Sequence, residues 1–239
     1  MQNPTAAMVV IGDEILSGRT RDANMHFLAC ELTQKGIDLK EVRVISDDAS
    51  IITETVKQVA GSYDHVFTSG GIGPTHDDIT ADCVAAAFGQ HIDVRADARD
   101  LLQAHYDKTG RELNEARLRM ARIPDDATLI ENPISIAPGF AIENVYVMAG
   151  VPSVFKAMVA SVLPGLTGGA PLLSVSERIE RGEGDIAGPL AVLAEKYSDL
   201  SIGSYPFQDN GLYGANIVAR GTDQAQLDAF VTNLKKVFA

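Results

Sequence analysis

The feature that most limits the fold of this chain is the alternation of short β-branched runs with helical periods in its first half. The run AAMVVI at 6–11 predicts a buried strand, and residues 24–35 carry apolar side chains at helical spacing before Gly36, where a left-handed helix cap belongs. The order repeats with a strand at 42–45 and a helix around 52–59. Strands that alternate with helices form βαβ units. The first half therefore predicts an α/β fold with a mostly parallel sheet.

The rest of the chain predicts an insertion, a return to strands and a smaller second unit. We expect charged surface helices at 96–109 and 112–122, strands at 128–130, 140–142 and 145–149, and a helix at 153–163. The stretch 164–171 is rich in Gly and Pro and predicts a linker. It separates a first domain at 1–165 from a small α+β domain at 172–239. The smaller domain has the expected order βαββα, with its elements at 172–179, 185–197, 200–205, 215–219 and 224–237.

A glycine-rich loop follows the strand predicted at 65–68. Gly70, Gly71 and Gly73 leave backbone N–H groups open, and a helix predicted at 79–88 points its positive end at the same place. An anion such as a phosphate fits this arrangement. The residues Thr75 to Asp78 give the Thr-x-x-Asp pattern of a helix capping box.

Two common glycine-loop motifs do not match this loop. A Rossmann fingerprint would need glycine at His76, and a P-loop would end in Gly-Lys-Ser/Thr. Ligands in open α/β sheets lie at the carboxyl ends of strands, and both this loop and Gly12-Asp13-Glu14 directly follow predicted strands. The two segments are therefore expected to face one crevice.

The loop carries acidic residues but no basic ones. No Lys or Arg lies between Thr68 and Asp82, whereas Asp77 and Asp78 lie next to the glycines. Phosphates beside unpaired carboxylates repel one another, so a cation is expected between them. Carboxylate oxygens favour Mg²⁺ or Mn²⁺. We therefore predict a divalent metal held by Asp77 and Asp78, which Asp47 after the second strand could join.

Other interpretations of these side chains stay open. Asp77 and Asp78 could instead stabilise the start of a helix, which is the preferred interpretation of Asp48 and Asp82. His76 is either a proton donor to a leaving phosphate oxygen or an exposed side chain. Arg19 and Arg21 either recognise an acidic part of the ligand or lie in solvent.

Net charge and cysteine content exclude several classes of protein. A net charge of −12 argues against nucleic acid as a partner, because such affinity comes from Lys and Arg on phosphates. Cys30 and Cys83 have no metal-knuckle or redox spacing. The first residues lack a signal peptide's pattern, and no apolar run is long enough to span a membrane. A cytoplasmic protein without a membrane partner is expected.

Several motifs together resemble one family. The chain is similar to the amino-terminal molybdopterin-binding-like domain of competence/damage-inducible protein A (CinA) over most of residues 6–165. The motifs that carry this resemblance are Gly12-Asp13-Glu14-Ile15-Leu16-Ser17-Gly18, Asp22-Ala23-Asn24, Asp47-Asp48, the loop 69–80, Pro138-Gly139-Phe140 and Gly150-Val151-Pro152. The resemblance implies a three-layer α/β/α domain, followed by a small βαββα domain, in a homo-oligomer such as a dimer or trimer.

The resemblance also implies a set of site residues. Catalytic roles are expected for Asp13, Glu14, Asp77 and Asp78, and metal binding for Asp47, Asp77 and Asp78. The residues expected to bind the ligand are Gly12, Asn24, Ser69, Gly70, Gly71, Gly73, Thr75, Thr80 and Gly139.

Comparison within the resemblance narrows the expected activity. The segment Ile202-Gly203-Ser204-Tyr205-Pro206 resembles the one that follows this domain in short CinA-like proteins and in eukaryotic FAD synthases. No segment matches the carboxy-terminal amidohydrolase domain of full-length CinA, so that activity is not expected. Molybdopterin adenylyltransferases carry arginine after the glycine loop, whereas this chain has Thr75, His76 and Asp77.

Three functions remain in view. The first is hydrolysis of the pyrophosphate bond of ADP-ribose or a related dinucleotide with Mg²⁺, Mn²⁺ or Co²⁺, giving AMP and a sugar phosphate. The second is binding or adenylylation of molybdopterin, which rests on fold analogy. The third is binding of a nucleotide without turnover. In each case the partner is a small phosphate-bearing ligand.

Overall fold

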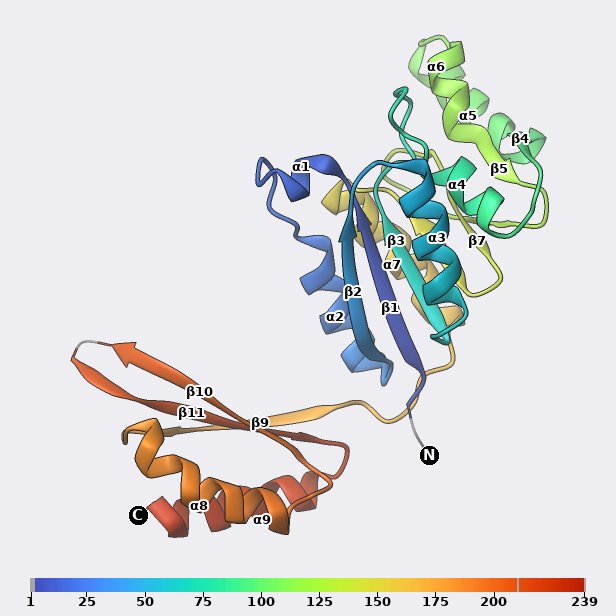
Figure 1. The fold of residues 1–239 in the computed structure, drawn as a ribbon. Helices are drawn as coiled ribbons and strands as arrows, with labels where there is room; N and C mark the ends of the chain where they lie inside the picture. Colours follow the sequence, from blue (N-terminus) through green and yellow to red (C-terminus); the bar gives the residue numbers. More distant parts are fainter. Residues whose placement is uncertain (1–2, 210, 239) are drawn as a thin grey trace. The chain divides into compact units, whose positions relative to one another are not determined.

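The computed structural model describes residues 3–209 and 211–238, which divide into two compact units, Met1–Gly169 and Ala170–Ala239. Figure 1 shows the elements of each unit. In the described part of the chain, no helix is both long and apolar enough to cross a membrane.

The first unit contains a six-stranded sheet in the order β2-β1-β3-β8-β7-β6. Neighbouring strands from β2 to β8 run parallel, and β7 and β6 are antiparallel to their neighbours. This confirms the prediction of a mostly parallel sheet. The six strands are β1 (Thr5–Ile11), β2 (Asp38–Ile45), β3 (His65–Ser69), β6 (Thr128–Ile130), β7 (Gly139–Ile142) and β8 (Val145–Met148).

Helices cover both faces of this sheet. Successive side chains of the central strand point to opposite faces, so each face has its own apolar core against helices. Along β1, Ala7 and Val9 pack into a core with helices α3 and α4, whereas Met8 and Val10 pack into a second core with α2 and α7. The helices are α2 (Asn24–Lys35), α3 (Ala49–Ala60), α4 (Thr80–Ala87) and α7 (Pro152–Val162). The predicted three-layer α/β/α architecture is confirmed (Figure 1).

An insertion between α4 and β6 differs from the sequence prediction. Its elements are β4 (Ile92–Val94), α5 (Ala96–Thr109), α6 (Glu115–Leu118), the short 3₁₀ helix η1 (Arg119–Ala121) and β5 (Arg122–Pro124). The helix predicted at 112–122 was therefore too long. Ala121 and Ile123 are buried in the core that contains α4, and β5 pairs with β4, so tertiary packing overrides the helical pattern.

The segment predicted as a linker packs largely against the first unit. It begins in a second 3₁₀ helix, η2 (Leu163–Gly165), and Leu166 is buried beside α2 and α7. The Gly169 amide donates to the Gly36 carbonyl oxygen at 2.9 Å. The boundary between the units consequently falls after Gly169.

The second unit has the predicted βαββα order. It contains β9 (Leu173–Ile179), α8 (Glu183–Lys196), β10 (Ser201–Asp209), β11 (Leu212–Gly221) and α9 (Gln224–Phe238). The antiparallel sheet has the order β10-β11-β9, and its apolar side chains pack with α8 and α9 around buried Phe230.

Candidate functional site

The carboxyl ends of β1, β3 and β8 meet at one edge of the main sheet. Val10 is in register with Ser69, and Ser69 is in register with Met148. The chain leaves β1 toward β2 on one side of the sheet and later returns to β3 on the other, which makes this edge a topological switch point. A cleft of about 760 Å³ lies here.

Three main groups of residues line this cleft, together with the polar residues Thr20, Asn132, Ser135 and Ser153. The loops after β1 and β3 contribute Gly12, Gly70, Gly71 and Gly73. The acidic residues are Glu14, Asp47, Asp77 and Asp78. An apolar group includes Ile72, Met120, Ile134, Val151, Val154 and Met158. The predicted meeting of the loop after β1 with the glycine-rich loop is therefore present in the structure.

The glycines of the loop allow the backbone to approach its neighbours closely. Gly70 and Gly71 have φ angles of 112° and 69°, and a Cβ atom at these positions would lie 2.2 Å from the Ile11 carbonyl oxygen and 2.1 Å from Thr80 Oγ1. The Gly70 amide donates to the sheet, but no hydrogen bond formed within the described part of the chain uses the N–H groups of Gly71, Ile72 or Gly73. These three amides can therefore bind an anion.

Negative charge is concentrated around Asp47. The Asp47 Oδ2 atom accepts a hydrogen bond from the Asp13 amide at 2.9 Å. Burial raises the pKa of Asp47, repulsion from Asp13, Glu14 and Asp77 raises it further, and the Asp13 amide opposes both effects. A cation between these carboxylates would relieve the repulsion.

The fit to a divalent metal depends on a small number of ligands. Across residues 3–209 and 211–238, no three His, Cys, Asp or Glu side chains are placed together as metal ligands. Mg²⁺ sites in nucleotide enzymes use one or two carboxylates together with waters and substrate phosphates. A pair such as Asp47 and Asp77 therefore fits a metal that the ligand itself completes.

Asp78 closes the glycine-rich loop. Its Oδ2 atom accepts hydrogen bonds from the Thr75 amide at 2.8 Å and from Thr75 Oγ1 at 2.6 Å. Helix α4 begins only at Thr80, and its N-cap residue, Ile79, makes no side-chain cap. The capping-box prediction was therefore wrong: the Thr75–Asp78 pair forms a turn within the loop and does not cap the helix.

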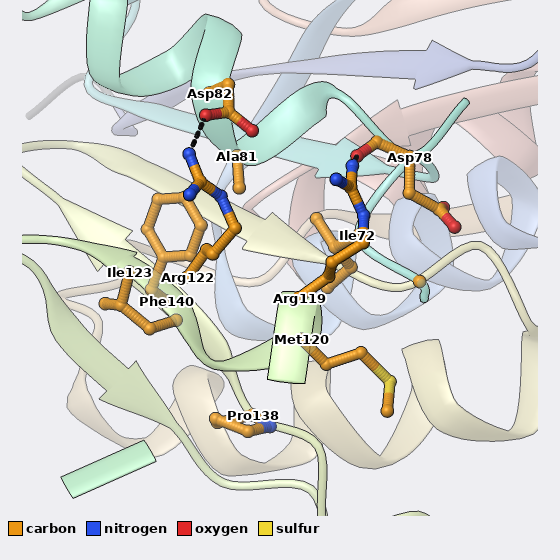
Figure 2. Close-up of a pocket in the computed structure, with 11 residues that line it drawn as sticks. Ile72, Asp78, Ala81, Asp82, Arg119, Met120, Arg122, Ile123, Pro138 and Phe140 are labelled. Carbon is orange, nitrogen blue, oxygen red and sulfur yellow. Dashed lines mark hydrogen bonds and ion pairs between the residues drawn. The ribbon is translucent and has the colours of Figure 1, made fainter. Parts of the chain in front are cut away.

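Arginines from the insertion lie against the same loop (Figure 2). An Nη2–H group of Arg119 donates to the Asp78 carbonyl oxygen at 3.2 Å, and Arg122 forms an ion pair with Asp82. The loop has no basic residue nearby in the sequence, but the folded insertion supplies two. The inference of a metal from missing basic residues was therefore incomplete, and only the crowding around Asp47 now supports it.

Asn24 and Ser69 lie behind the loop, outside the cleft lining. Both are buried, with Asn24 Nδ2 donating to Ser69 Oγ at 2.7 Å and to the Gly150 carbonyl oxygen at 2.8 Å. This network joins the start of α2 to the ends of β3 and β8. The hydrogen bonds of Asn24 and Ser69 therefore fix the positions of the chain segments that form the site.

The other predicted site residues occupy structural positions. Thr80 is buried beneath Gly71, and Gly139 lies in β7, where a Cβ atom would approach the Val147 carbonyl oxygen to 2.5 Å. Thr75 is exposed, and Asp13 donates its amide to Asp47 while its carboxylate repels that of Asp47. None of these four residues lines the cleft among the residues that the structure describes.

The structure also shows where three polar residues with open interpretations lie. Asp48 caps α3 by accepting hydrogen bonds from the Ser50 and Ile51 amides, as preferred from the sequence. Asp82 lies in the first turn of α4 and pairs with Arg122. The His76 side chain is 98% exposed and lies 3.9 Å from Asp77, so it points to solvent in this structure.

Each of the two units matches a known domain family. Residues 7–168 match the probable molybdopterin binding domain, and residues 171–239 match the middle domain of FAD synthase. The solved structure of CinA from Thermoplasma acidophilum, described as a protein of unknown function, is 32% identical with a TM-score of 0.63. That match covers 69% of this chain and 99% of the other.

Two curated relatives extend this result. A probable FAD synthase from Caenorhabditis elegans is 33% identical over 263 aligned residues, covering 100% of this chain and 50% of the relative. A protein from Archaeoglobus fulgidus is 31% identical, covering 83% of this chain and 84% of the relative. The chain spans about half the length of the probable FAD synthases that it matches. By these matches and its fold, the chain belongs to the CinA-like members of the probable molybdopterin-binding domain family and carries a FAD synthase middle domain after it.

Proposed function

We propose that the chain hydrolyses the pyrophosphate bond of a nucleotide with the help of a divalent metal. The observation that carries this proposal is the crowding of carboxylates around Asp47, in the cleft that Gly71 to Gly73 with their open amides also line. In the reaction, water adds to one phosphorus atom and the bridging oxygen leaves with the other half of the substrate. ADP-ribose would give AMP and ribose 5-phosphate.

Two sets of groups in the cleft would bind the substrate and the metal. The loop amides would bind phosphate oxygens, and Asp47 and Asp77 would hold the metal. When bound, the ion supplies the positive charge that brings phosphates and carboxylates together. Asp78 is assigned to loop closure, because its Oδ2 atom accepts hydrogen bonds from both the amide and the hydroxyl of Thr75, whereas Asp47 Oδ2 accepts one, from the Asp13 amide.

The substrates to test follow from the relatives. FAD and ADP-ribose each contain a pyrophosphate between two larger groups, and two relatives that cover essentially the whole chain are named probable FAD synthases. Both therefore belong in the same assay.

The test measures AMP release by the purified chain with Mg²⁺, Mn²⁺ or Co²⁺. We expect AMP from ADP-ribose or FAD that depends on the metal and is lost in Asp77→Asn. Asp126→Asn is a matched control, since Asp126 is an exposed acidic residue that does not line the cleft. Absence of AMP with every metal and both substrates would refute the proposal.

Pterin binding is a second candidate. The match to the probable molybdopterin binding domain and the apolar group in the cleft favour it. It predicts that the protein purified from its native host carries a fluorescent pterin, and that this ligand is lost when Gly71 is replaced. Recovery of pterin without AMP release would favour this candidate over hydrolysis.

A further inference from the structure

Two exposed apolar side chains line the cleft that contains the glycine-rich loop. Ile134, in the connection between β6 and β7, and Val151, just before α7, are each 59% exposed. Large apolar side chains at this exposure contact water unless a ligand or partner covers them. Since both line one cleft of about 760 Å³, the same ligand can cover both.

A buried asparagine fixes the position of Ile134. Asn132 is 5% exposed, and its Oδ1 atom accepts hydrogen bonds from the amides of Ile134 and Ser135 at 3.1 and 3.2 Å. Its Nδ2 group donates to Ser135 Oγ at 2.6 Å and to the Ala137 carbonyl oxygen at 2.8 Å. Every polar atom of this side chain is therefore used to hold the turn that presents Ile134.

The same turn contains an unfavourable backbone conformation. Ile136 has a φ angle of 67°, which a β-branched residue rarely adopts. Its amide donates to the Asn132 carbonyl oxygen at 3.0 Å, which closes the turn. Such conformations persist only where the surroundings enforce them, and they are concentrated at ligand sites. This turn presents the exposed side chain of Ile134 at the cleft.

We infer that Ile134 and Val151 form an apolar wall that binds the planar ring of the ligand, while the loop amides and carboxylates bind its phosphates. This inference deepens the proposed function, on which it rests for the phosphate end of the ligand. The shared chemistry is a nitrogen heterocycle on a diphosphate chain, found in nucleotides, flavins and pterins.

The composition of the wall also bears on base selectivity. Ile134, Val151 and their neighbours Val154 and Met158 contribute apolar side chains to the wall, and Ser135 and Ser153 lie beside it in the cleft lining. Apolar surfaces distinguish poorly between rings of similar size, whereas hydrogen-bonding groups distinguish them strongly. The wall therefore recognises the presence of a purine more than its identity.

The experiment measures binding with ligands that cannot be hydrolysed. Isothermal titration with Mg²⁺ compares α,β-methylene-ADP, α,β-methylene-GDP and ring-free methylene diphosphonate on the wild type, Ile134→Ala and Val151→Ala. Leu101→Ala is the matched control, because Leu101 is 47% exposed on α5 and does not line the cleft. A thermal melt of each variant checks folding, and Ile134→Val repeats the test with a smaller change.

We expect Ile134→Ala to weaken binding of both nucleotide analogues about tenfold, from the loss of apolar contact with the ring. Ile134→Ala should bind methylene diphosphonate as tightly as the wild type does, and Leu101→Ala should bind all three ligands as tightly as the wild type. On the wild type, the Kd values of the two nucleotide analogues should differ by less than about tenfold. The inference fails if the wild type binds the nucleotide analogues no more tightly than methylene diphosphonate. It also fails if Ile134→Ala weakens all three ligands equally, or none of them.

These outcomes are separate from those of the hydrolysis assay. Ring-dependent binding without AMP release would refute hydrolysis and leave the apolar wall in place. AMP release together with unchanged nucleotide binding in Ile134→Ala and Val151→Ala would support hydrolysis and refute the wall.

Discussion

Arg119 donates a hydrogen bond to the carbonyl oxygen of Asp78, 3.2 Å away and 41 residues earlier in the chain. The contact joins the insertion to the glycine-rich loop at the residue whose carboxylate closes that loop (Figure 2). Arg122 adds a second connection through its ion pair with Asp82. The insertion therefore acts as a support for the loop, and its sequence matters to the site although it lies outside the main sheet.

Replacing Arg119 should lower both the stability of the loop and the activity. Arg119→Ala removes a charged hydrogen-bond donor to the loop, which costs roughly 1.5–3 kcal/mol when such a bond is lost. A shift of the loop by about 1 Å is expected to lower kcat/KM about 10- to 100-fold in the AMP assay. Arg99→Ala is the control, because Arg99 forms an ion pair with exposed Asp100 on the same helix. Equal activity in the two variants would contradict a supporting role for Arg119.

Substitutions of Asp77 and of Asp78 should have different effects on activity and stability. Asp77→Asn should abolish metal-dependent activity with only a small fall in Tm, because the Asp77 side chain is largely exposed but a hydrogen bond from Thr75 to its carboxylate lowers its pKa. Asp78→Ala should lower stability by about 1 kcal/mol through its lost hydrogen bonds to Thr75. The measurements are Tm and AMP release for each variant.

Thr75→Val provides the control for this assignment. It removes the hydroxyl partner of Asp78 and keeps both carboxylates, so it should reproduce part of the stability loss of Asp78→Ala. If Asp78→Ala abolished activity at unchanged Tm while Thr75→Val had no effect, Asp78 would be a functional ligand and not a loop-closing residue.

The parts of the fold that were predictable from sequence are those governed by local periodicity. The buried strand at the start, the helix that Gly36 ends and the βαββα order of the second unit all follow from short-range patterns and are present. The helix predicted at 112–122 failed because Ala121 and Ile123 are drawn into the core, a contact between distant segments that a local pattern does not contain.

The candidate site was predictable only in part, for a similar reason. The meeting of Gly12 with the glycine-rich loop follows from both segments ending parallel strands. The positions of Arg119 and Ile134 depend on how the insertion and the β6–β7 connection fold back to the cleft. Asn132 followed by Pro133 was an available sequence signal for the connection, because asparagine often closes turns through its side chain and Asn-Pro favours a turn.

Gly71 should tolerate no side chain. Gly71→Ala would place a Cβ atom 2.1 Å from Thr80 Oγ1, and the φ angle of 69° adds strain. Gly89→Ala is a matched control with a φ angle of 64° and no atom within 4 Å of its Cβ position. Both variants bear a left-handed strain of roughly 1–2 kcal/mol, but only Gly71→Ala adds a steric clash. We therefore expect a larger fall in Tm for Gly71→Ala, and equal falls would show that the loop relaxes freely.

Asp47 should link stability, pH and metal binding. Its folded-state pKa is raised above the ordinary value of 3.8, chiefly by burial and then by the carboxylates of Asp13, Glu14 and Asp77. A raised acid pKa means that protonation stabilises the fold: this contribution is complete below pH 3.8 and is lost as pH rises through the folded-state pKa. At neutral pH the charged Asp47 therefore lowers stability.

Asp47→Asn should consequently raise Tm at pH 7, and its advantage over the wild type should vanish as pH falls toward 3.8. Mn²⁺ should raise the Tm of the wild type, because a cation that binds only the folded state stabilises it, and should raise that of Asp47→Asn much less. Asp126→Asn, an exposed control, should respond to Mn²⁺ as the wild type does. Thermal melts across pH, with and without Mn²⁺, test both effects. An equal response of Asp47→Asn and the wild type to Mn²⁺ would show that Asp47 does not hold the metal.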